Sequence, residues 1–208
     1  MSPKKFIPAA AALVCLLAPL ASQAQDSAAP GPWMVRARAV YLDPANHDDT
    51  GLDLSINSKT IPEIDISYFF TPNWAAELVL TVPQKHDIRS GGSTIGSLKH
   101  LPPTLTAQYH FTNLGAFKPY LGAGVNYTRF SSVSFSPAVA AALQPSIDKS
   151  SVGLALQAGV DFDLGHNLVL NFDIKKLQLR TDVSSFGNRV GEFRVDPWLV
   201  GVGLGWRF

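Results

Sequence analysis

Residues 151–164 read SVGLALQAGVDFDL, and every second residue from Val152 to Leu164 is apolar. Gln157, Asp161 and Asp163 lie between them, on the opposite face of an extended chain. A soluble sheet would turn the apolar row toward a core and the carboxylates toward water. A membrane barrel would turn the apolar row toward lipid and the polar row toward its lumen. The alternation therefore predicts a strand and leaves two environments open for it.

The same alternation recurs along the chain, and the connections between its segments follow a pattern of their own. The predicted strands are 33–42, 61–71, 74–82, 101–111, 119–130, 151–164, 168–180 and 197–208. Short turns alternate strictly with long loops, which are 43–60, 84–100, 131–150 and 182–195. Outer-membrane barrels join their strands in this way, and an even number of strands places both termini on the periplasmic side.

Aromatic residues gather near the predicted strand ends, as in the two interfacial girdles of a membrane barrel. The girdle beside the short turns is predicted to contain Trp33, Phe69, Phe70, Trp74, Tyr109, Phe111, Tyr120, Trp206 and Phe208. The girdle beside the long loops is predicted to contain Tyr41, Tyr127, Phe130 and Trp198. Aromatics of a soluble core would be spread through the strand centres instead.

Residues 1–24 begin with the basic Lys4 and Lys5, continue as an apolar run and end in small residues before Gln25. This order is typical of a secretory signal peptide. The single cysteine, Cys15, lies inside it, so the exported part has no thiol for a disulfide, a metal site or a nucleophile. Without Lys4 and Lys5 the chain keeps 15 Lys and Arg against 16 Asp and Glu, and no basic patch suggests a nucleic-acid partner.

These observations together predict an all-β fold. Residues 25–208 are expected to form a single domain, an eight-stranded antiparallel transmembrane β-barrel of the bacterial outer membrane. No run of 18 apolar residues follows the predicted signal peptide, so a helical membrane protein is not expected. Val152 and the apolar residues that alternate with it are predicted to face lipid, and Gln157, Asp161 and Asp163 to face the lumen.

Four segments resemble the outer membrane protein W (OmpW) family with its AlkL relatives. They are YFFTPNWAAEL (68–78), LPPTLTAQYHF (101–111), KPYLGAGVNYTRF (118–130) and DPWLVGVGLGWRF (196–208). The resemblance implies a narrow, largely hydrophobic interior that carries small apolar compounds across the outer membrane. The terminal Phe208, after alternating apolar residues, also resembles the signal read by the barrel-assembly machinery.

An eight-stranded barrel is just wide enough to be filled by side chains or to hold one small ligand, which disfavours an open diffusive pore. Opposite charges on adjacent strands should pair in such a lumen, because an unpaired buried charge is costly. The predicted plug of salt bridges consists of Arg36, Arg38, Glu63, Asp65, Glu77 and Arg207. The other polar lumen residues are predicted to be Gln108, His110, Gln157, Asp161, Asp173 and Lys175. An ion-selective constriction is the alternative function for the charged set.

An apolar solute that meets a plugged lumen must leave sideways. Pro83, Pro102 and Pro103 lack the N–H donors that a barrel wall uses, so they either mark a lateral exit or merely end their strands. Leu52, Leu54 and Ile56 alternate in the first long loop and are candidates for an apolar vestibule or gate. The Ala-rich segment 137–147 either lines this vestibule or forms a short surface helix over 138–144.

The predicted function is passive uptake of small hydrophobic molecules, with lateral exit into the bilayer. The expected partners are outer-membrane lipids, small hydrophobic solutes and the assembly machinery. A lipid-modifying enzyme is one alternative, with Ser93 or Ser97 near His100 as conceivable reactive groups, and a structural surface barrel is another. His47, His86, His100, His110 and His166 fit no motif of fixed catalytic geometry, and the loop histidines among them are predicted to be solvated. No catalytic residue, metal site or cofactor is therefore expected.

Overall fold

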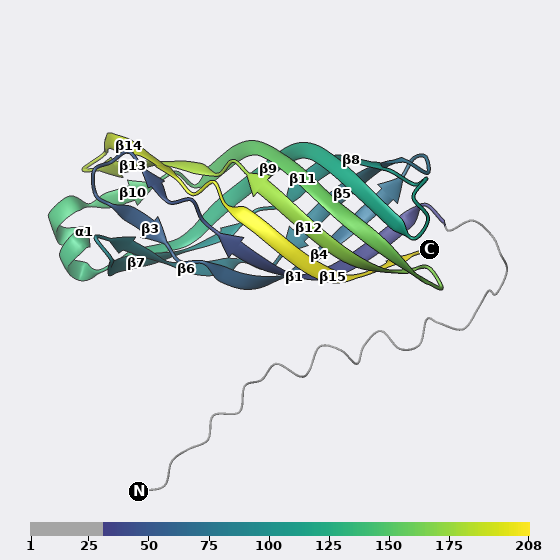
Figure 1. The fold of residues 1–208 in the computed structure, drawn as a ribbon. Coiled ribbons are helices and arrows are strands. Elements are labelled where there is room, and N and C mark those ends of the chain that lie inside the picture. The colour runs from purple at the N-terminus through teal and green to yellow at the C-terminus, as the bar shows by residue number, and fades with distance from the viewer. Residues whose placement is uncertain (1–30) are drawn as a thin grey trace, which may run out of the picture.

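The computed structural model describes residues 31–208, and the predicted signal peptide lies outside these residues. Eight long antiparallel strands close into an elongated barrel (Figure 1). They are β1 (Trp33–Asp43), β4 (Lys59–Phe69), β5 (Trp74–Thr81), β8 (Thr104–His110), β9 (Phe117–Phe135), β11 (Ser150–Gly165), β12 (Leu168–Leu177) and β15 (Trp198–Arg207). Neighbours in this order pair, and β15 pairs back onto β1, so the eight strands form a closed barrel. The predicted fold class is confirmed.

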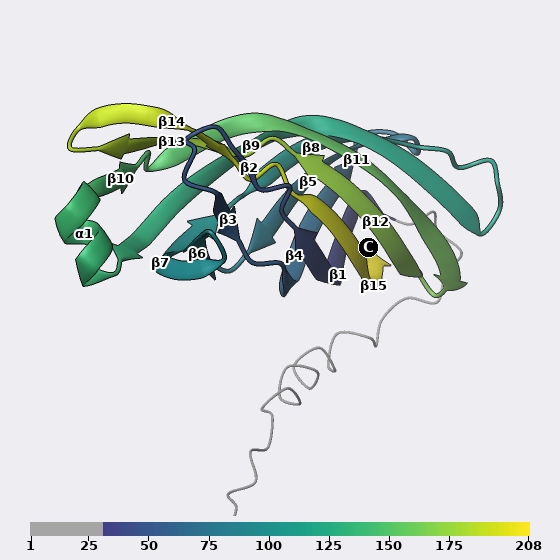
Figure 2. The ribbon, with the colours of Figure 1, turned by 60° about the vertical axis from the view of Figure 1, so that its left-hand side comes forward.

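The four long connections are folded rather than irregular. They contain β2 (His47–Asp48), β3 (Leu54–Ile56), β6 (Gln84–Ser90), β7 (Ser93–Leu101), α1 (Pro137–Leu143), β10 (Pro145–Ile147), β13 (Arg180–Ser185) and β14 (Asn188–Arg194). All of them gather at the end of the barrel away from the C-terminus, called the hairpin end below (Figure 2). The three short turns and the C-terminus mark the opposite end, called the turn end. The four long connections are present as predicted, and their internal structure, which the sequence left open, extends the barrel: β6 pairs with β3 and β7, and β7 pairs with β9.

Most predicted strand bounds agree with the observed ones to within two residues, apart from β9, which continues to Phe135 rather than ending at 130, and two further exceptions. The predicted strand 101–111 begins late, because Leu101 ends β7 and Pro102 and Pro103 lie outside any strand. The predicted strand 168–180 ends early, at Leu177, and Arg180 begins β13. A proline has no N–H for the ladder, which explains the first difference.

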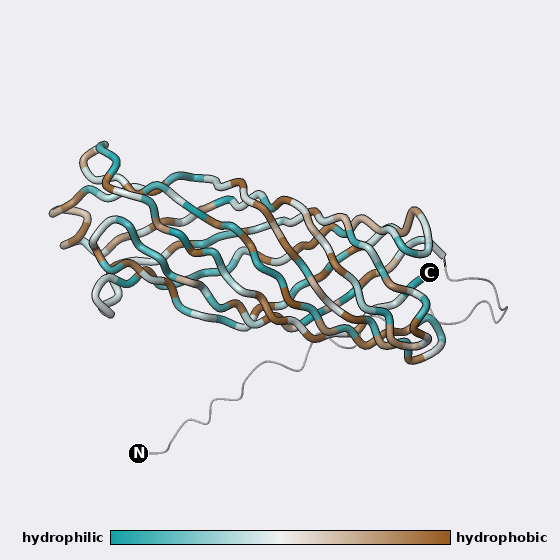
Figure 3. Tube along the Cα trace, turned by 45° about the horizontal axis from the view of Figure 1, so that its top comes forward, coloured by the Kyte–Doolittle hydropathy of each residue, from teal (hydrophilic) through white to brown (hydrophobic). Residues whose placement is uncertain are grey.

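The outer face of the barrel is apolar and its inner face is polar over much of its length. On β11, Val152, Leu154 and Leu156 are exposed by 75%, 59% and 62%, whereas Gln157 and Asp161 are buried inside the barrel. Figure 3 shows the resulting alternation of hydrophobic and hydrophilic residues along neighbouring strands. The predicted orientation of residues 151–164 is therefore correct.

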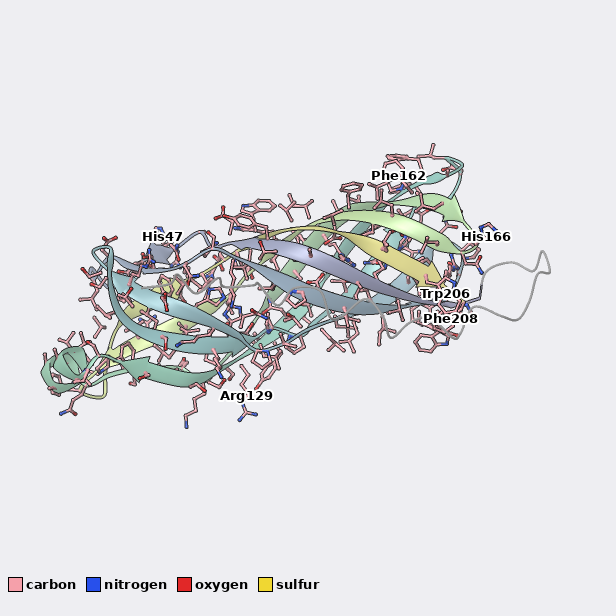
Figure 4. The ribbon with its side chains drawn as sticks, turned by 90° about the horizontal axis from the view of Figure 1, so that it is seen from below. His47, Arg129, Phe162, His166, Trp206 and Phe208 are labelled. Atoms are coloured by element: carbon pink, nitrogen blue, oxygen red, sulfur yellow. The ribbon has the colours of Figure 1, made fainter. Side chains whose placement is uncertain are left out.

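Most of the predicted aromatic girdle at the turn end is present, with Trp33, Phe70, Trp74, Tyr109, Phe111, Trp206 and Phe208 exposed. Figure 4 shows Trp206 and Phe208 at this end and His47 toward the other. Phe69, Tyr120 and Phe130 were wrongly assigned to girdles, because they are buried and share the inward row of their strands. No helix among residues 31–208 is long and apolar enough to cross a membrane.

Candidate functional site

The lumen changes character along the barrel axis, and β1 shows the change most simply. Its inward row starts with Met34 at the turn end, continues with Arg36 and Arg38, and finishes with Val40 and Leu42 toward the hairpin end. All five side chains are buried. Other strands add an apolar cluster on each side of the arginines, whereas β8 and β9 contribute the buried polar Thr104, Asn126 and Thr128, so the lumen has a charged middle between two partly apolar levels.

The charged middle is a continuous network of ion pairs, called the plug below. Arg36 binds Asp161 from β11 at 2.7 Å, and it also contacts Asp65 and Glu77 at 3.2 Å each. Arg38 contacts Asp65 at 2.7 Å and Glu77 at 2.8 Å. The two arginines are therefore tied through shared carboxylates, which links β1 to strands on both sides of the lumen.

Lys175 of β12 extends the plug. Its ammonium group lies 2.6 Å from Glu63 and 2.9 Å from Asp173, and Asp173 also lies 2.9 Å from Arg38. Three cations thus meet five carboxyl groups, namely Glu63, Asp65, Glu77, Asp161 and Asp173. Neutral donors complete the network, since a buried carboxylate needs further hydrogen bonds to be tolerated.

These neutral donors come from the wall opposite β1. The Gln157 amide donates to Glu77 at 2.9 Å and to Asp173 at 2.8 Å, and the Tyr120 hydroxyl donates to Asp173 at 2.6 Å. Thr106 and Gln108 donate to the Gln157 carbonyl at 3.1 Å each. The plug therefore spans the lumen from wall to wall.

The structure gathers five of the six residues predicted for the plug, and it adds Asp161, Asp173 and Lys175, which were predicted only as polar lumen residues. Gln108 and Gln157 join it through hydrogen bonds, and His110 lies 3.0 Å from Gln108. The sixth residue, Arg207, is a correction. Its guanidinium donates to the Gly31 carbonyl and stacks on the Phe69 ring, 3.8 Å from the centroid. It forms no ion pair with any residue of 31–208, because the last position of β15 places it at the rim of the turn end.

Beyond the plug, toward the hairpin end, the lumen becomes apolar. A buried cluster of Val40, Leu42, Ile61, Ala155, Leu177 and Leu199 lines its wall from five strands. None of these residues was predicted to face the lumen as a group. The inward parity of Arg36 and Arg38, continued to Val40 and Leu42, was the signal that could have found them.

One part of the wall at this level lacks ladder hydrogen bonds. The ladder between β4 and β5 ends at Glu63 and Thr81, and β6 next pairs with β3 rather than β4. Residues 57–62 and 82–87 therefore face each other across a seam. Side chains close it: Thr81 donates to the Pro62 carbonyl at 2.8 Å, and the Asn57 Oδ1 accepts from the Asp87 N–H at 2.9 Å.

Of the prolines predicted for a lateral exit, Pro83 lies at this seam, whereas Pro102 and Pro103 lie one strand further along the wall, beside residues 80–83, which are unpaired on that side. Pro83 separates β5 from β6, and Pro102 and Pro103 separate β7 from β8, so the pairing of β5 with β8 stops at Val79 and Thr104. The Pro103 carbonyl accepts from the N–H of Tyr127, an exposed aromatic of the second girdle. Tyr41, another exposed aromatic of that girdle, pairs with Thr60 of the seam, so the seam lies at the level of the girdle, and β6 and β7 lie beyond it.

A largely apolar pocket occupies the hairpin end. Its lining is Leu52, Leu54, Ile56, Ile88, Ile95, Leu98, Phe135, Val139, Leu143, Pro145, Ile147, Thr181, Val183 and Phe193. Leu52, Leu54 and Ile56, the predicted vestibule residues, all belong to it. The predicted alternatives for the Ala-rich segment are both partly realised, because α1 is a short surface helix whose Val139 and Leu143 face the pocket.

Two histidines lie between the pocket and the seam. His86 and His100 face inward on β6 and β7, are 0% and 1% exposed, and stack with ring centroids 4.7 Å apart. Both were predicted to be solvated loop residues, and this was wrong. The loop folds as a hairpin that continues the barrel, and each histidine occupies an inward position of it.

The environment of the pair lowers the basicity of both rings. Burial lowers the pKa of His86 from its ordinary value, and burial together with the neighbouring His86 and Lys59 lowers the pKa of His100 to about 3. Both rings are therefore neutral at neutral pH. Neither nitrogen of His100 has a hydrogen-bond partner among residues 31–208, so it activates neither Ser93 nor Ser97.

Acidification is expected to destabilise β6 and β7. An unfolded histidine takes up its proton near pH 6.5, whereas folded His100 does so only near 3. Between these values the unfolded chain binds more protons, so stability falls as the pH drops through this window and is unaffected above it. Amide hydrogen exchange of β6 and β7 at neutral and at acid pH measures this. The His100→Phe variant should show a weaker pH dependence, and an equal dependence would contradict the assignment.

No cluster of three or more potential metal ligands of the His, Cys, Asp and Glu types occurs within residues 31–208. The polar side chains of the lumen are therefore engaged in ion pairs and hydrogen bonds or belong to the histidine pair.

Comparison with known proteins gives a consistent picture. The model of the OmpW family matches residues 30–208. An outer-membrane protein of Sinorhizobium fredii, y4mB, is 40% identical over 98% of this chain and 92% of its own length. Outer membrane protein W of Vibrio cholerae is 30% identical over 94% of this chain and 97% of its own.

A third relative and one solved structure extend the comparison. The dibenzothiophene metabolism operon protein PahQ of Pseudomonas aeruginosa is 28% identical over 94% of this chain and 98% of its own length. The crystal structure of the outer membrane protein OprG from Pseudomonas aeruginosa superposes with a TM-score of 0.76 at 27% identity, covering 86% of this chain and 96% of that one. The match extends over nearly the whole barrel.

Proposed function

We propose that this chain, which belongs to the OmpW family of outer-membrane β-barrels, mediates passive uptake of small hydrophobic molecules. The solute enters the lumen from the hairpin end and leaves sideways into the bilayer. One observation carries this proposal. The apolar pocket at the hairpin end and the apolar cluster around Val40 and Leu42 both lie on the same side of the plug. A solute that enters the pocket thus meets apolar walls first and buried ion pairs last.

The plug makes a route through the whole barrel unfavourable. An apolar solute would have to separate Arg36 and Arg38 from their carboxylates and offer no hydrogen bonds in return. An ion would have to cross the apolar pocket first. The lumen is therefore suited neither to an ion-selective constriction nor to straight passage of an apolar solute.

For the solute, leaving through the seam between residues 57–62 and 82–87 costs less free energy than passing the plug. Parting it breaks a few side-chain hydrogen bonds, such as that from Thr81 to the Pro62 carbonyl, and no ladder bond. It lies at the level of the second aromatic girdle, so a solute that passes it arrives at the edge of the hydrocarbon layer. We therefore assign Pro83 to the exit, and Pro102 and Pro103 to the neighbouring break in the wall, where β8 ends its pairing with β5.

The orientation follows from the same reasoning. Short turns of outer-membrane barrels lie in the periplasm, so we place the turn end and both termini there and the apolar pocket outside the cell. The partners are then outer-membrane lipids around the apolar face and hydrophobic solutes in the pocket. Phe208, whose N–H donates to the Trp33 carbonyl at 2.8 Å, is proposed as part of the signal for the barrel-assembly machinery.

One relative supports the chemical class of the solute. PahQ is named for a dibenzothiophene metabolism operon, and dibenzothiophene is a small apolar aromatic compound. An apolar pocket lined by leucine, isoleucine, valine and phenylalanine suits such a compound.

Uptake of radiolabelled decane into proteoliposomes with a lipopolysaccharide outer leaflet tests the proposal. The protein is expected to raise the uptake rate above that of protein-free vesicles. Leu98→Arg places a charge in the pocket and should lower uptake at least about tenfold. Val190→Arg, at an exposed position of β14 outside the pocket lining, is the matched control and should leave uptake unchanged.

Two results would contradict the proposal. Uptake equal to that of protein-free vesicles would favour a structural surface barrel. Release of fatty acid or altered headgroups from the lipid, abolished by His100→Phe, would favour the lipid-modifying enzyme.

A further inference from the structure

We infer that His86 and His100 form a polar subsite for a hydroxyl group, so that the preferred solute is an apolar molecule carrying one hydroxyl, such as a long-chain alcohol or a phenol. The inference rests on the proposed uptake function and narrows its substrate class. It starts from an irregularity of the structure: three ring nitrogens of this pair are buried without a hydrogen-bond partner among residues 31–208. Buried polar groups are nearly always paired, so such a concentration needs an explanation.

The hydrogen-bonding capacity of each ring can be worked out. The His86 Nδ1 lies 2.9 Å from the Asn57 carbonyl oxygen, which can only accept, so this nitrogen carries the proton. The Nε2 of the neutral His86 ring is then a free acceptor. His100 is also neutral and offers one donor and one acceptor, both free. The pair therefore offers two free acceptors and one free donor.

A hydroxyl group matches this arrangement better than other small polar groups do. Its O–H can donate to the His86 Nε2 while its oxygen accepts from the N–H of His100. A ketone oxygen can only accept, and a hydrocarbon uses neither nitrogen. A metal ion is not favoured, since the pair supplies two nitrogen ligands and no cluster of three or more His, Cys, Asp or Glu side chains occurs among residues 31–208.

The apolar part of such a solute would lie in the apolar pocket next to the two histidines. Ile88 and Leu98 follow the histidines toward the hairpin end on the same inward faces, and both line the apolar pocket. Asn57 contacts His86 from the other side of the seam, through its carbonyl oxygen at 2.9 Å. A solute with its apolar body in the pocket would thus present its hydroxyl to the histidines directly before the exit.

Binding is tested with protein in nanodiscs whose histidines carry ¹⁵N. Titration with 1-decanol is expected to shift the His86 Nε2 and His100 nitrogen resonances, and titration with decane is expected to leave them in place. Shifts that are equal for the two compounds, or absent for decanol, would overturn the subsite. The wild-type protein suffices for this measurement, so no variant has to fold.

Transport is tested with the same two probes in the proteoliposomes described above. His86→Phe and His100→Phe keep the stacked aromatic rings and remove the nitrogens. His100→Phe should lower decanol uptake by about fivefold to tenfold, as expected for one lost hydrogen bond, and leave decane uptake unchanged. His86→Phe also removes the contact with the Asn57 carbonyl across the seam, so its effect is measured as a fall in the ratio of decanol uptake to decane uptake. His47→Phe is the matched control, because His47 is exposed at the same end of the barrel.

The outcomes separate this inference from the proposed function. Uptake of both probes at equal rates, insensitive to His86→Phe and His100→Phe, would leave the transporter standing and overturn the subsite. Uptake of neither probe would overturn the proposed function, and the nitrogen resonances would then decide alone whether the pair binds a hydroxyl.

Discussion

Replacement of Arg38 by Met is expected to lower the free energy of unfolding by about 3–5 kcal/mol, as for other buried ion pairs that lose one partner. Arg38 lies within 2.9 Å of Asp65, Glu77 and Asp173, and all three carboxyl groups are buried. Without the guanidinium these carboxyl groups keep their desolvation cost and lose their main compensation. The measurement is equilibrium urea unfolding in lipid vesicles, followed by tryptophan fluorescence.

Arg207→Met is the matched control for this prediction. Arg207 forms no ion pair with any residue of 31–208 and is only partly buried at the rim of the turn end. Replacement of Arg207 should lower the free energy of unfolding much less than replacement of Arg38 does. A double variant, Arg38→Met with Glu77→Gln, should regain part of the loss, because it removes one uncompensated carboxylate. Equal destabilisation by Arg38→Met and Arg207→Met would show that the plug does not stabilise the barrel.

The barrel itself was predictable because the residues of a membrane strand alternate between apolar side chains that face lipid and polar side chains that face the lumen. On β11 the apolar residues from Val152 to Leu164 alternate with Gln157 and Asp161, and this period of two is set by the pleat alone. The charged residues of the plug were predictable for the same reason. Arg36, for example, can only pair inside the barrel once its strand neighbours face lipid.

The hairpin end was not predictable in the same way, because its structure depends on contacts between distant segments. Residues 84–100 place Gln84, His86 and Ile88 on one face, and this mixture of polar and apolar residues shows no period. They form strands because β3 and β9 supply pairing partners on either side. The buried positions of His86 and His100 follow from that pairing and could not be read from their loop-like composition.

Phe69 shows that the presence of an aromatic residue at a strand end does not tell whether its side chain faces lipid or the lumen. Phe69 and Phe70 are adjacent, so one must face inward and the other outward, and composition does not say which. The inward row of Asp65 and Ser67 decides it, since it continues to Phe69. Counting parity from the charged residues would have placed Phe69 under Arg207, where the structure has it.

A covalent link across the seam is expected to abolish uptake if the solute leaves sideways. Asn57 and Asp87 face each other there, with the Asn57 Oδ1 2.9 Å from the Asp87 N–H, so Asn57→Cys and Asp87→Cys should place two thiols within reach of a disulfide or a short bismaleimide. The exported chain contains no other cysteine, because Cys15 lies in the predicted signal peptide. Decane uptake in proteoliposomes should fall at least about tenfold on oxidation, the loss expected when an obligatory opening of the wall costs more than about 1.4 kcal/mol extra. A reductant should restore it.

The single variants Asn57→Cys and Asp87→Cys control for the lost seam contacts, and oxidation should leave their uptake unchanged. The pocket and the plug stay as they are in the linked protein, because neither residue lines the pocket or belongs to the plug. Undiminished uptake after complete linkage would therefore exclude exit at this seam and leave passage past Arg36 and Arg38 as the remaining route. In that case Arg38→Met should raise uptake, whereas with exit through the seam it should not.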